Sequence, residues 1–164
     1  MKVKKPWAPT MEEMRNAIKA TGEVETIVLE SFTREAFPKS VEEMNKGIRE
    51  TIEVALAKAK NVVVSTIIAR EDEDDIQDKI NLINANTKYA FKGNDRVFIC
   101  DNTNLNDTKF RPKDQLHLSD HGTAVFANNL KYKIAESLGV TVKKKNRSSY
   151  GYDNTHNSYY NYNN

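Results

Sequence analysis

The stretch NVVVSTII at residues 61–68 decides the predicted fold class of this chain. It is nearly continuous in apolar residues, and two shorter runs are similar to it, TIVL at residues 26–29 and RVFIC at residues 96–100. Strands have this composition when both faces of a parallel sheet are covered, because neither side of such a strand faces water. The three runs start 35 residues apart, which leaves room for one crossover helix between each pair.

The segments between these runs carry the periodicity of amphipathic helices. One helix is expected to begin after Ser40, which forms a capping-box pattern with Glu43. A second is expected from near Asp72, and a last one from near Ser119, with Gly139 directly after its end. A shorter helix is expected ahead of the first run. The apolar stripes of the four expected helices are, in chain order, Met11, Met14 and Ile18; Val41, Met44, Ile48, Ile52, Ala55 and Ala59; Ile76, Ile80 and Ile83; and Phe126, Leu130, Ile134 and Leu138.

This alternation predicts one α/β domain over residues 1–140, with a parallel sheet between helices on both faces. Residues 2–5 are a candidate for a further, weak edge strand. The polar stretch of residues 102–113 follows the third run without periodicity, and its asparagines fit turn positions. Open α/β sheets bind ligands beyond the carboxyl ends of their strands, so we expect a functional site near this stretch.

The composition excludes several classes of protein. The 164 residues suit a single domain, and the 38% of apolar and 29% of charged residues exclude collagen and a wholly disordered chain. The single cysteine, Cys100, excludes an internal disulfide framework and a multi-cysteine zinc site, and we expect it to be a small buried residue. No apolar run approaches the roughly 20 residues that span a bilayer, and the N-terminus lacks the apolar part of a secretory signal, so we expect an intracellular protein. The net charge of +2 is too small to indicate nucleic-acid binding by itself.

The strongest local signal for chemistry is DQLH at residues 114–117, followed by LSDHG at residues 118–122 and the last expected helix. A carboxylate three residues before a histidine can accept a hydrogen bond from the imidazole Nδ1–H, which leaves Nε2 free to act as a base. Taken alone, Asp114 and His117 also fit a simpler interpretation, a turn residue and a histidine that bonds a backbone carbonyl. A hydrolase needs, in addition, a nucleophile and an oxyanion hole.

The Asp-x-x-His pattern, with Leu-Ser-x-x-Gly and a C-terminal amphipathic helix, resembles the last block of the SGNH (GDSL-type) hydrolases. Upstream, VVVSTIIAR at residues 62–70 is similar to that family's strand with a Pro-Arg-like corner, and INLIN at residues 80–84 to its helix with an Ile-Asn step. The resemblance covers about residues 20–138. It implies a three-layer, flavodoxin-like sheet and the hydrolysis of a small acyl ester without a cofactor, in which His117 is the base and Asp114 orients it.

The chain departs from the family at the residues that would attack the ester and stabilise the oxyanion. It contains no Gly-Asp-Ser block, so the first strand of the family pattern is missing. The Gly-x-Asn-Asp block should follow residues 26–29, but Phe32 stands in place of its glycine and Arg34 in place of its asparagine. Arg34 and Glu35 are expected to form a solvated loop pair. The resemblance therefore implies a catalytically degenerate domain, or an active esterase when an upstream segment supplies the serine.

Other candidates for the missing groups are weaker. Ser31 lacks the glycine-flanked turn of a nucleophile elbow, Ser65 lies within a buried run where its hydroxyl fits a bond to the backbone, and Ser119 fits a helix cap. His117 and His121, together with a neighbouring aspartate, have no third histidine nearby in the sequence. We therefore expect no metal site.

The missing first strand has a consequence for assembly. Without it, the strand at residues 26–29 is expected to have an unpaired edge. An exposed edge presents free backbone N–H and C=O groups that pair readily with another chain. We therefore expect self-association through the sheet edge.

Residues 141–164 differ in composition from the rest of the chain. The segment after residue 147 is almost entirely Tyr, Asn, Ser and Gly, which cannot bury a core, so we expect a disordered tail. A basic cluster precedes it, made of Lys143, Lys144, Lys145 and Arg147. Basic residues followed by tyrosines also fit RNA or single-stranded nucleic acid, so a non-catalytic interaction or RNA-binding module is the rival to the hydrolase interpretation.

Overall fold

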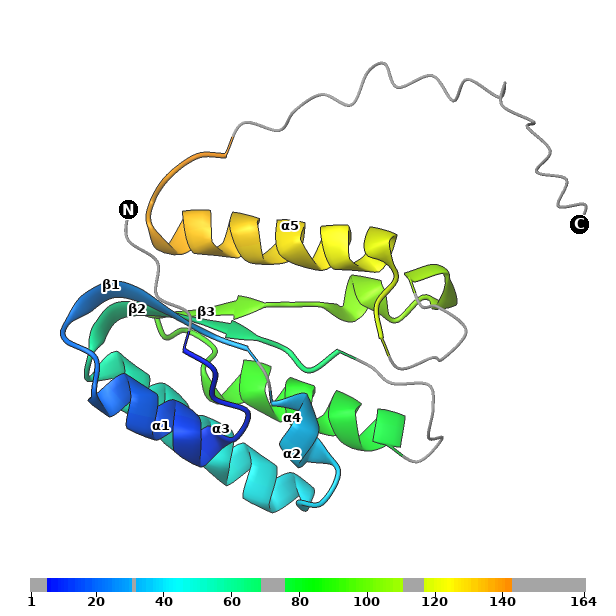
Figure 1. The fold of residues 1–164 in the computed structure, drawn as a ribbon, viewed down its shortest axis with the longest axis horizontal. Helices are drawn as coiled ribbons and strands as arrows, with labels where there is room; N and C mark the ends of the chain where they lie inside the picture. Colours follow the sequence, from blue (N-terminus) through cyan, green and yellow to red (C-terminus); the bar gives the residue numbers. More distant parts are fainter. Residues whose placement is uncertain (1–5, 31, 69–75, 111–116, 143–164) are drawn as a thin grey trace, which may run out of the picture.

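Three parallel strands form the centre of the domain (Figure 1). They are β1 (Val24–Leu29), β2 (Ala59–Ser65) and β3 (Val97–Cys100), in the spatial order β1-β2-β3. The structure is a computed structural model, and it describes residues 6–30, 32–68, 76–110 and 117–142. Each strand overlaps one of the three apolar runs, so the predicted parallel sheet is confirmed.

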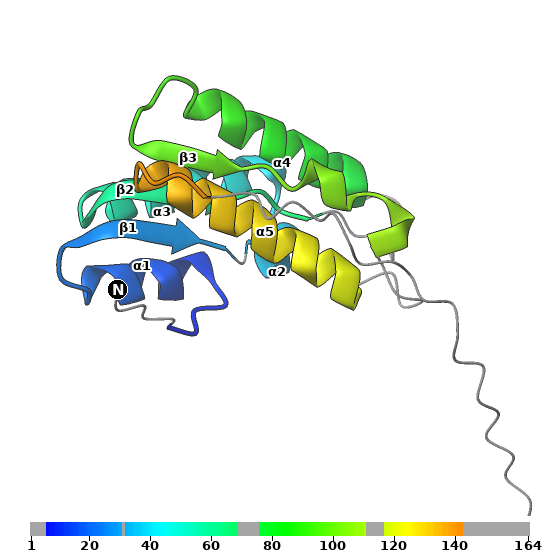
Figure 2. The same ribbon diagram turned by 90° about the horizontal axis from the view of Figure 1, so that it is seen from above.

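Helices cover both faces of the sheet (Figures 1 and 2). The helices on one face are α1 (Met11–Lys19), α3 (Val41–Leu56) and α4 (Ile76–Ala90). In the described part of the chain, the opposite face carries α5 (Asp120–Ser137). The short elements are α2 (Thr33–Ala36) after β1, and two 3-10 turns after β3, η1 (Thr103–Leu105) and η2 (Thr108–Phe110). This arrangement confirms the predicted α/β class with helices on both faces.

The register of the sheet places one set of side chains against α1, α3 and α4. Ile27 pairs with Val62, and Val62 pairs with Val97, so these three side chains lie on the same face of the sheet. They pack into the main hydrophobic core. Burial of one such side chain stabilises a protein by roughly 1.5–3 kcal/mol, so this layer contributes substantially to the stability of the fold. Its members without any exposed surface are Ala36, Met44, Ile52, Ala55, Val62, Ile80 and Ile83.

Capping boxes begin two helices of this layer. In the predicted box, the Glu43 N–H donates to Ser40 Oγ at 3.2 Å, and the Ser40 N–H donates to the Glu43 carboxylate at 2.7 Å. The bond from the Ser40 backbone lowers the pKa of Glu43. Thr10 and Glu13 form an equivalent box at the start of α1. That second box was not predicted, although its residues have the same spacing.

The face under α5 is less completely buried. The predicted stripe of Phe126, Leu130, Ile134 and Leu138 is only half-buried. The fully buried residues of α5 are instead small ones, Gly122, Ala135 and Ser137. Near the C-terminal end of α5, Asn61 Nδ2 of β2 donates to the Ser137 carbonyl at 2.5 Å. Small side chains and polar bonds therefore hold this helix against the sheet.

Several element boundaries differ from the prediction. β2 ends at Ser65, so residues 66–68 continue beyond the strand, and α2 was not predicted. The start expected near Asp72 lies outside the described residues, as does the candidate edge strand at residues 2–5. None of the helices in the described part of the chain has the length and apolar character of a bilayer-spanning segment.

Candidate functional site

The carboxyl ends of the three strands meet at one edge of the sheet, on the right in Figure 1. α2 follows β1 at this edge, η1 and η2 follow β3, and α5 begins there. Figure 2 shows the same convergence from above. Because ligands of open α/β sheets bind beyond the strand ends, this edge is the candidate functional site.

His117 lies at the start of α5, in the turn before the helix. Its side chain is exposed, and two residues later Ser119 caps the helix by accepting a hydrogen bond from the Gly122 N–H at 3.1 Å. The predicted helix start and its Ser119 cap are therefore confirmed. Asp114 lies outside the described residues, so its hydrogen bond to His117 stays a prediction.

Close packing explains the Leu-Ser-x-x-Gly part of the motif. The Ser119 N–H donates to the Phe110 carbonyl at 2.8 Å, which holds the turn after η2 against the start of α5. A Cβ atom on Gly122 would lie 2.5 Å from that same carbonyl oxygen. The rings of Phe110 and His121 meet edge to face, with centroids 5.1 Å apart. Ser119 and Gly122 thus have structural roles that need no catalysis.

The residues at the degenerate Gly-x-Asn-Asp block form α2 and its cap. Phe32 is 2% exposed and packs in the hydrophobic core, whereas Arg34 is exposed. The prediction that Arg34 and Glu35 form a solvated pair is wrong, because Glu35 is buried. The Glu35 carboxylate accepts hydrogen bonds from the Met11 N–H, at the start of α1, and from the Lys39 ammonium group. Glu35 therefore joins α2 to α1. The sequence did not predict this contact, because Glu35 and Met11 lie 24 positions apart in the chain.

A buried polar cluster that the sequence analysis missed fills the space beyond β2 and β3. Asn102 is 1% exposed; its N–H donates to Thr66 Oγ1 and its Nδ2 to Ser65 Oγ, both at 2.9 Å. Asn129 of α5 donates to Asn102 Oδ1 at 3.1 Å. Asn102 was predicted to be a turn residue. It is in addition buried, and its hydrogen bonds join the ends of the two strands to α5. Its side-chain donors and acceptor are already used inside the protein.

The described serines all have structural roles. Ser40 and Ser119 cap helices, and Ser137 lies at the C-terminal end of α5. Ser65 is buried, and its hydroxyl donates to the neighbouring Thr66 carbonyl at 3.3 Å, as the sequence predicted. Ser31 lies outside the described residues.

Two further features of the described residues bear on reactivity: the thiol of Cys100 and the grouping of potential metal ligands. Cys100 is buried, as predicted, and burial raises the pKa of its thiol to about 11. A thiolate is the reactive form, so this cysteine is inert at neutral pH. In residues 6–30, 32–68, 76–110 and 117–142, no three His, Cys, Asp or Glu side chains lie together as a set of metal ligands.

No protein-family model matches the chain, and no curated protein matches it significantly. The nucleic-acid candidates Lys143, Lys144, Lys145 and Arg147 lie outside the described residues. The described residues at the strand ends therefore remain the candidates for a functional site.

Proposed function

We propose that this chain is an SGNH-hydrolase-like domain, of flavodoxin-like architecture, that does not itself hydrolyse esters. The family resemblance of residues 114–122, the parallel sheet and the exposed His117 at the strand ends support the ancestry. The proposed loss of activity is supported mainly by the residues that follow β1. Phe32 anchors this block in the core, and an exposed Arg34 occupies the position of the oxyanion asparagine.

The energetic cost of this replacement is large. An oxyanion hole depends on donors that are held in place where negative charge develops. Arg34 forms no hydrogen bond or ion pair that would orient it against the described residues. Loss of one oxyanion donor costs about 3–4 kcal/mol of transition-state stabilisation. Without a nucleophile, the covalent route through an acyl-enzyme is also closed.

A steady-state assay of the purified chain tests this proposal. The substrate is a short-chain alkyl ester, because an exposed imidazole reacts by itself with activated nitrophenyl esters. We expect no saturable turnover by the native chain. His117→Ala is compared with His121→Ala, a second exposed histidine close by on the same helix start. Saturable turnover that disappears in the first variant and persists in the second would refute the proposal.

An active hydrolase completed by an upstream Gly-Asp-Ser segment is the second candidate. It is favoured by β1, which pairs with β2 on one side and has no described strand on its other side. Sequencing the transcript upstream of Met1 tests it. An in-frame Gly-Asp-Ser, with esterase activity of the longer chain that requires His117, would establish this candidate; a transcript without that segment would remove it.

A further inference from the structure

The charged residues of the chain are unevenly distributed along the sequence. Residues 123–147 contain six basic residues and one acidic residue, whereas residues 1–122 contain 19 basic and 21 acidic residues. The overall net charge of +2 therefore conceals a net +5 in a segment of 25 residues. No acidic residue occurs in the sequence between Glu136 and Asp153. Such segregation concentrates positive potential in one part of the molecule, which attracts polyanions.

The second half of α5 is the described part of this positive segment. Asn128, Lys131 and Tyr132 are exposed on it, and Asn128 adjoins both of the others, because residues three and four positions apart are neighbours on a helix. The Tyr132 side chain is 42% exposed. Lys131 forms no ion pair in the described part of the chain, whereas Lys133 bonds Glu136 at 2.8 Å. We call Asn128, Lys131 and Tyr132 the α5 patch.

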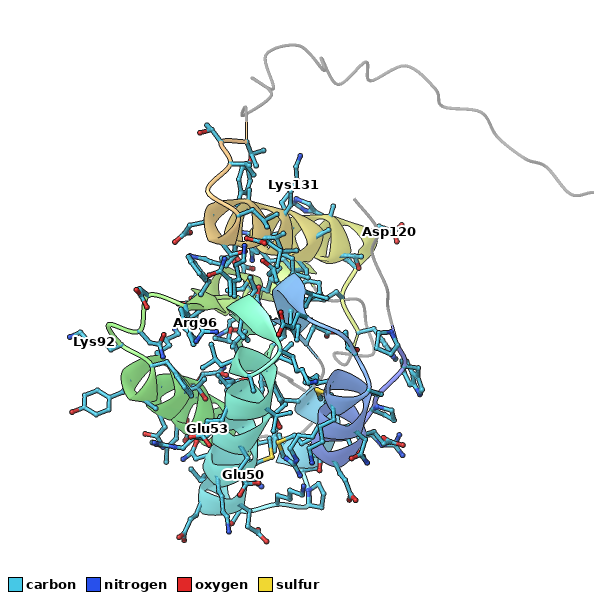
Figure 3. The ribbon with its side chains drawn as sticks, turned by 90° about the vertical axis from the view of Figure 1, so that its left-hand side faces the viewer. Glu50, Glu53, Lys92, Arg96, Asp120 and Lys131 are labelled. Carbon is cyan, nitrogen blue, oxygen red and sulfur yellow. The ribbon has the colours of Figure 1, made fainter. Side chains whose placement is uncertain are left out.

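The α5 patch and the most acidic helix lie on opposite faces of the sheet. Figure 3 shows Lys131 on α5, at the top of the molecule, and Glu50 and Glu53 on α3, at the bottom. The sequence of α3 contains four glutamates and only two basic residues, Lys46 and Arg49. Because like charges repel, a polyanion is expected to approach the molecule from the side of α5.

The chain leaves α5 at a defined place near the α5 patch. Gly139, with a φ of 64°, follows the end of the helix, and the Val140 N–H donates to the Ala135 carbonyl at 2.9 Å. Lys143 follows Val140 by three residues, which span at most about 11 Å of chain. Lys131 lies within two turns of the end of α5. The basic cluster of residues 143–147, although outside the described residues, therefore begins close to the α5 patch.

We propose that the α5 patch and the basic cluster bind a single-stranded nucleic acid, with phosphates on Lys131 and the cluster and a base stacked on Tyr132. Basic side chains neutralise phosphates and release their counterions, which gives affinity without sequence preference. An aromatic ring stacks on any unpaired base, and the Asn128 amide has both the donor and the acceptor that a base edge needs. Five further tyrosines follow in residues 148–164.

Other polyanions match this surface less completely. A duplex offers phosphates but keeps its bases paired, so Tyr132 would have no base to stack on. An anionic membrane would match the positive charges, but it has neither rings for Tyr132 nor base edges for Asn128. RNA and single-stranded DNA share the chemistry that the surface recognises. Because the proposal uses no residue of the strand-end site, it does not depend on the proposed function.

Fluorescence anisotropy of the full chain with a labelled oligouridylate of about 12 nucleotides tests the proposal, over salt concentrations of about 50–300 mM. Each neutralised phosphate of a single strand contributes about −0.7 to the slope of log K against log salt, so five basic side chains predict a slope of about −3.5. The same length of oligodeoxyuridylate differs in the 2′-hydroxyls. Tighter binding of the RNA identifies RNA as the ligand, and equal binding identifies an unpaired strand of either kind.

Variants of the α5 patch locate the binding. We expect Lys131→Ala to make the salt slope shallower by about 0.7, because it removes one phosphate contact. We expect Tyr132→Ala to weaken binding by about fivefold or more without a change of slope, because it removes a stacking ring. The matched controls are Lys46→Ala on α3 and Tyr89→Ala on α4, the same substitutions on the opposite face. Both controls should bind as the native chain does.

Three results would overturn the proposal. The first is no binding of either oligonucleotide at about 50 mM salt. The second is binding by Lys131→Ala and Tyr132→Ala that equals that of their controls. The third is tighter binding of a duplex of the same length, or of phosphatidylserine vesicles, than of the single strand. Thermal unfolding accompanies each titration, and we expect an unchanged Tm because the two substituted side chains are exposed.

Discussion

The two faces of the sheet are held by different interactions. On the side of α1, α3 and α4, large apolar residues such as Ile52 and Ile80 are completely buried. On the side of α5 the apolar stripe stays half-buried, and hydrogen bonds from Asn61 and Asn129 join the helix to the rest of the fold. Apolar burial therefore stabilises the first face, whereas polar contacts and close packing position the second. Of the candidate site at the strand ends, His117 and the Asn102 cluster belong to this second, less buried side, whereas Phe32 and Glu35 belong to the first.

Truncation of one apolar residue on each face tests this difference most strongly. We expect Ile80→Ala to lower the free energy of unfolding by about 3–4 kcal/mol, because it leaves a cavity in a fully buried site. Leu130→Ala on α5 should cost only about 1–2 kcal/mol, since that side chain is half-buried. Urea denaturation measures both, with Leu82→Ala, 51% exposed on α4, as the control of near-zero effect. Equal losses on the two faces would contradict the comparison.

Close packing at the start of α5 gives the next largest effect. Gly122→Ala places a Cβ atom 2.5 Å from the Phe110 carbonyl oxygen, so the turn after η2 must move away. We expect a loss of about 2 kcal/mol in thermal unfolding experiments. Gly22→Ala is the matched control, because a Cβ atom there has no neighbour within 4 Å. A Gly122→Ala variant as stable as this control would show that the contact is not needed.

A substitution on β1 should have the smallest effect on stability, because it is expected to change self-association and to leave the fold unaltered. Val28 is 39% exposed on the α5 side of β1, and the described residues provide no strand beyond this one. We propose that the chain self-associates there, so sedimentation should give a dimer or larger species. Val28→Lys should shift it to monomer with little change in Tm, because charged residues on an edge strand oppose pairing. Leu82→Lys, at an exposed apolar site on α4, is the control and should leave the association state unchanged. A native chain that sediments as a monomer would refute this proposal.

The sequence predicted those parts of the candidate site whose interactions join residues close together in the chain. The Ser119 cap reaches Gly122, three residues away, and the position of His117 before α5 follows from it. The Asn102 cluster joins residues 27 to 37 positions apart, and Glu35 bonds a backbone group 24 positions away. No periodic pattern marks such contacts. Asn84 of α4 forms another such contact, because it accepts from the Ile67 N–H at 2.9 Å and donates to the Ile67 carbonyl at 2.8 Å. Its burial could have been predicted, since it follows Ile80 by four residues and so falls on the predicted buried stripe.

The amino-acid sequence was sufficient to predict the three parallel strands, the helices between them and the caps of α3 and α5. These features follow from the period of apolar residues and from bonds across three positions, which act within a few residues of chain. The burial of Glu35, the position of Asn102 beyond the strands and the buried, unpartnered Oδ1 atom of Asn45 became visible only in the folded structure. The physical reason is that a polar side chain is satisfied or left unpaired by neighbours from distant parts of the chain, and folding alone brings those neighbours together.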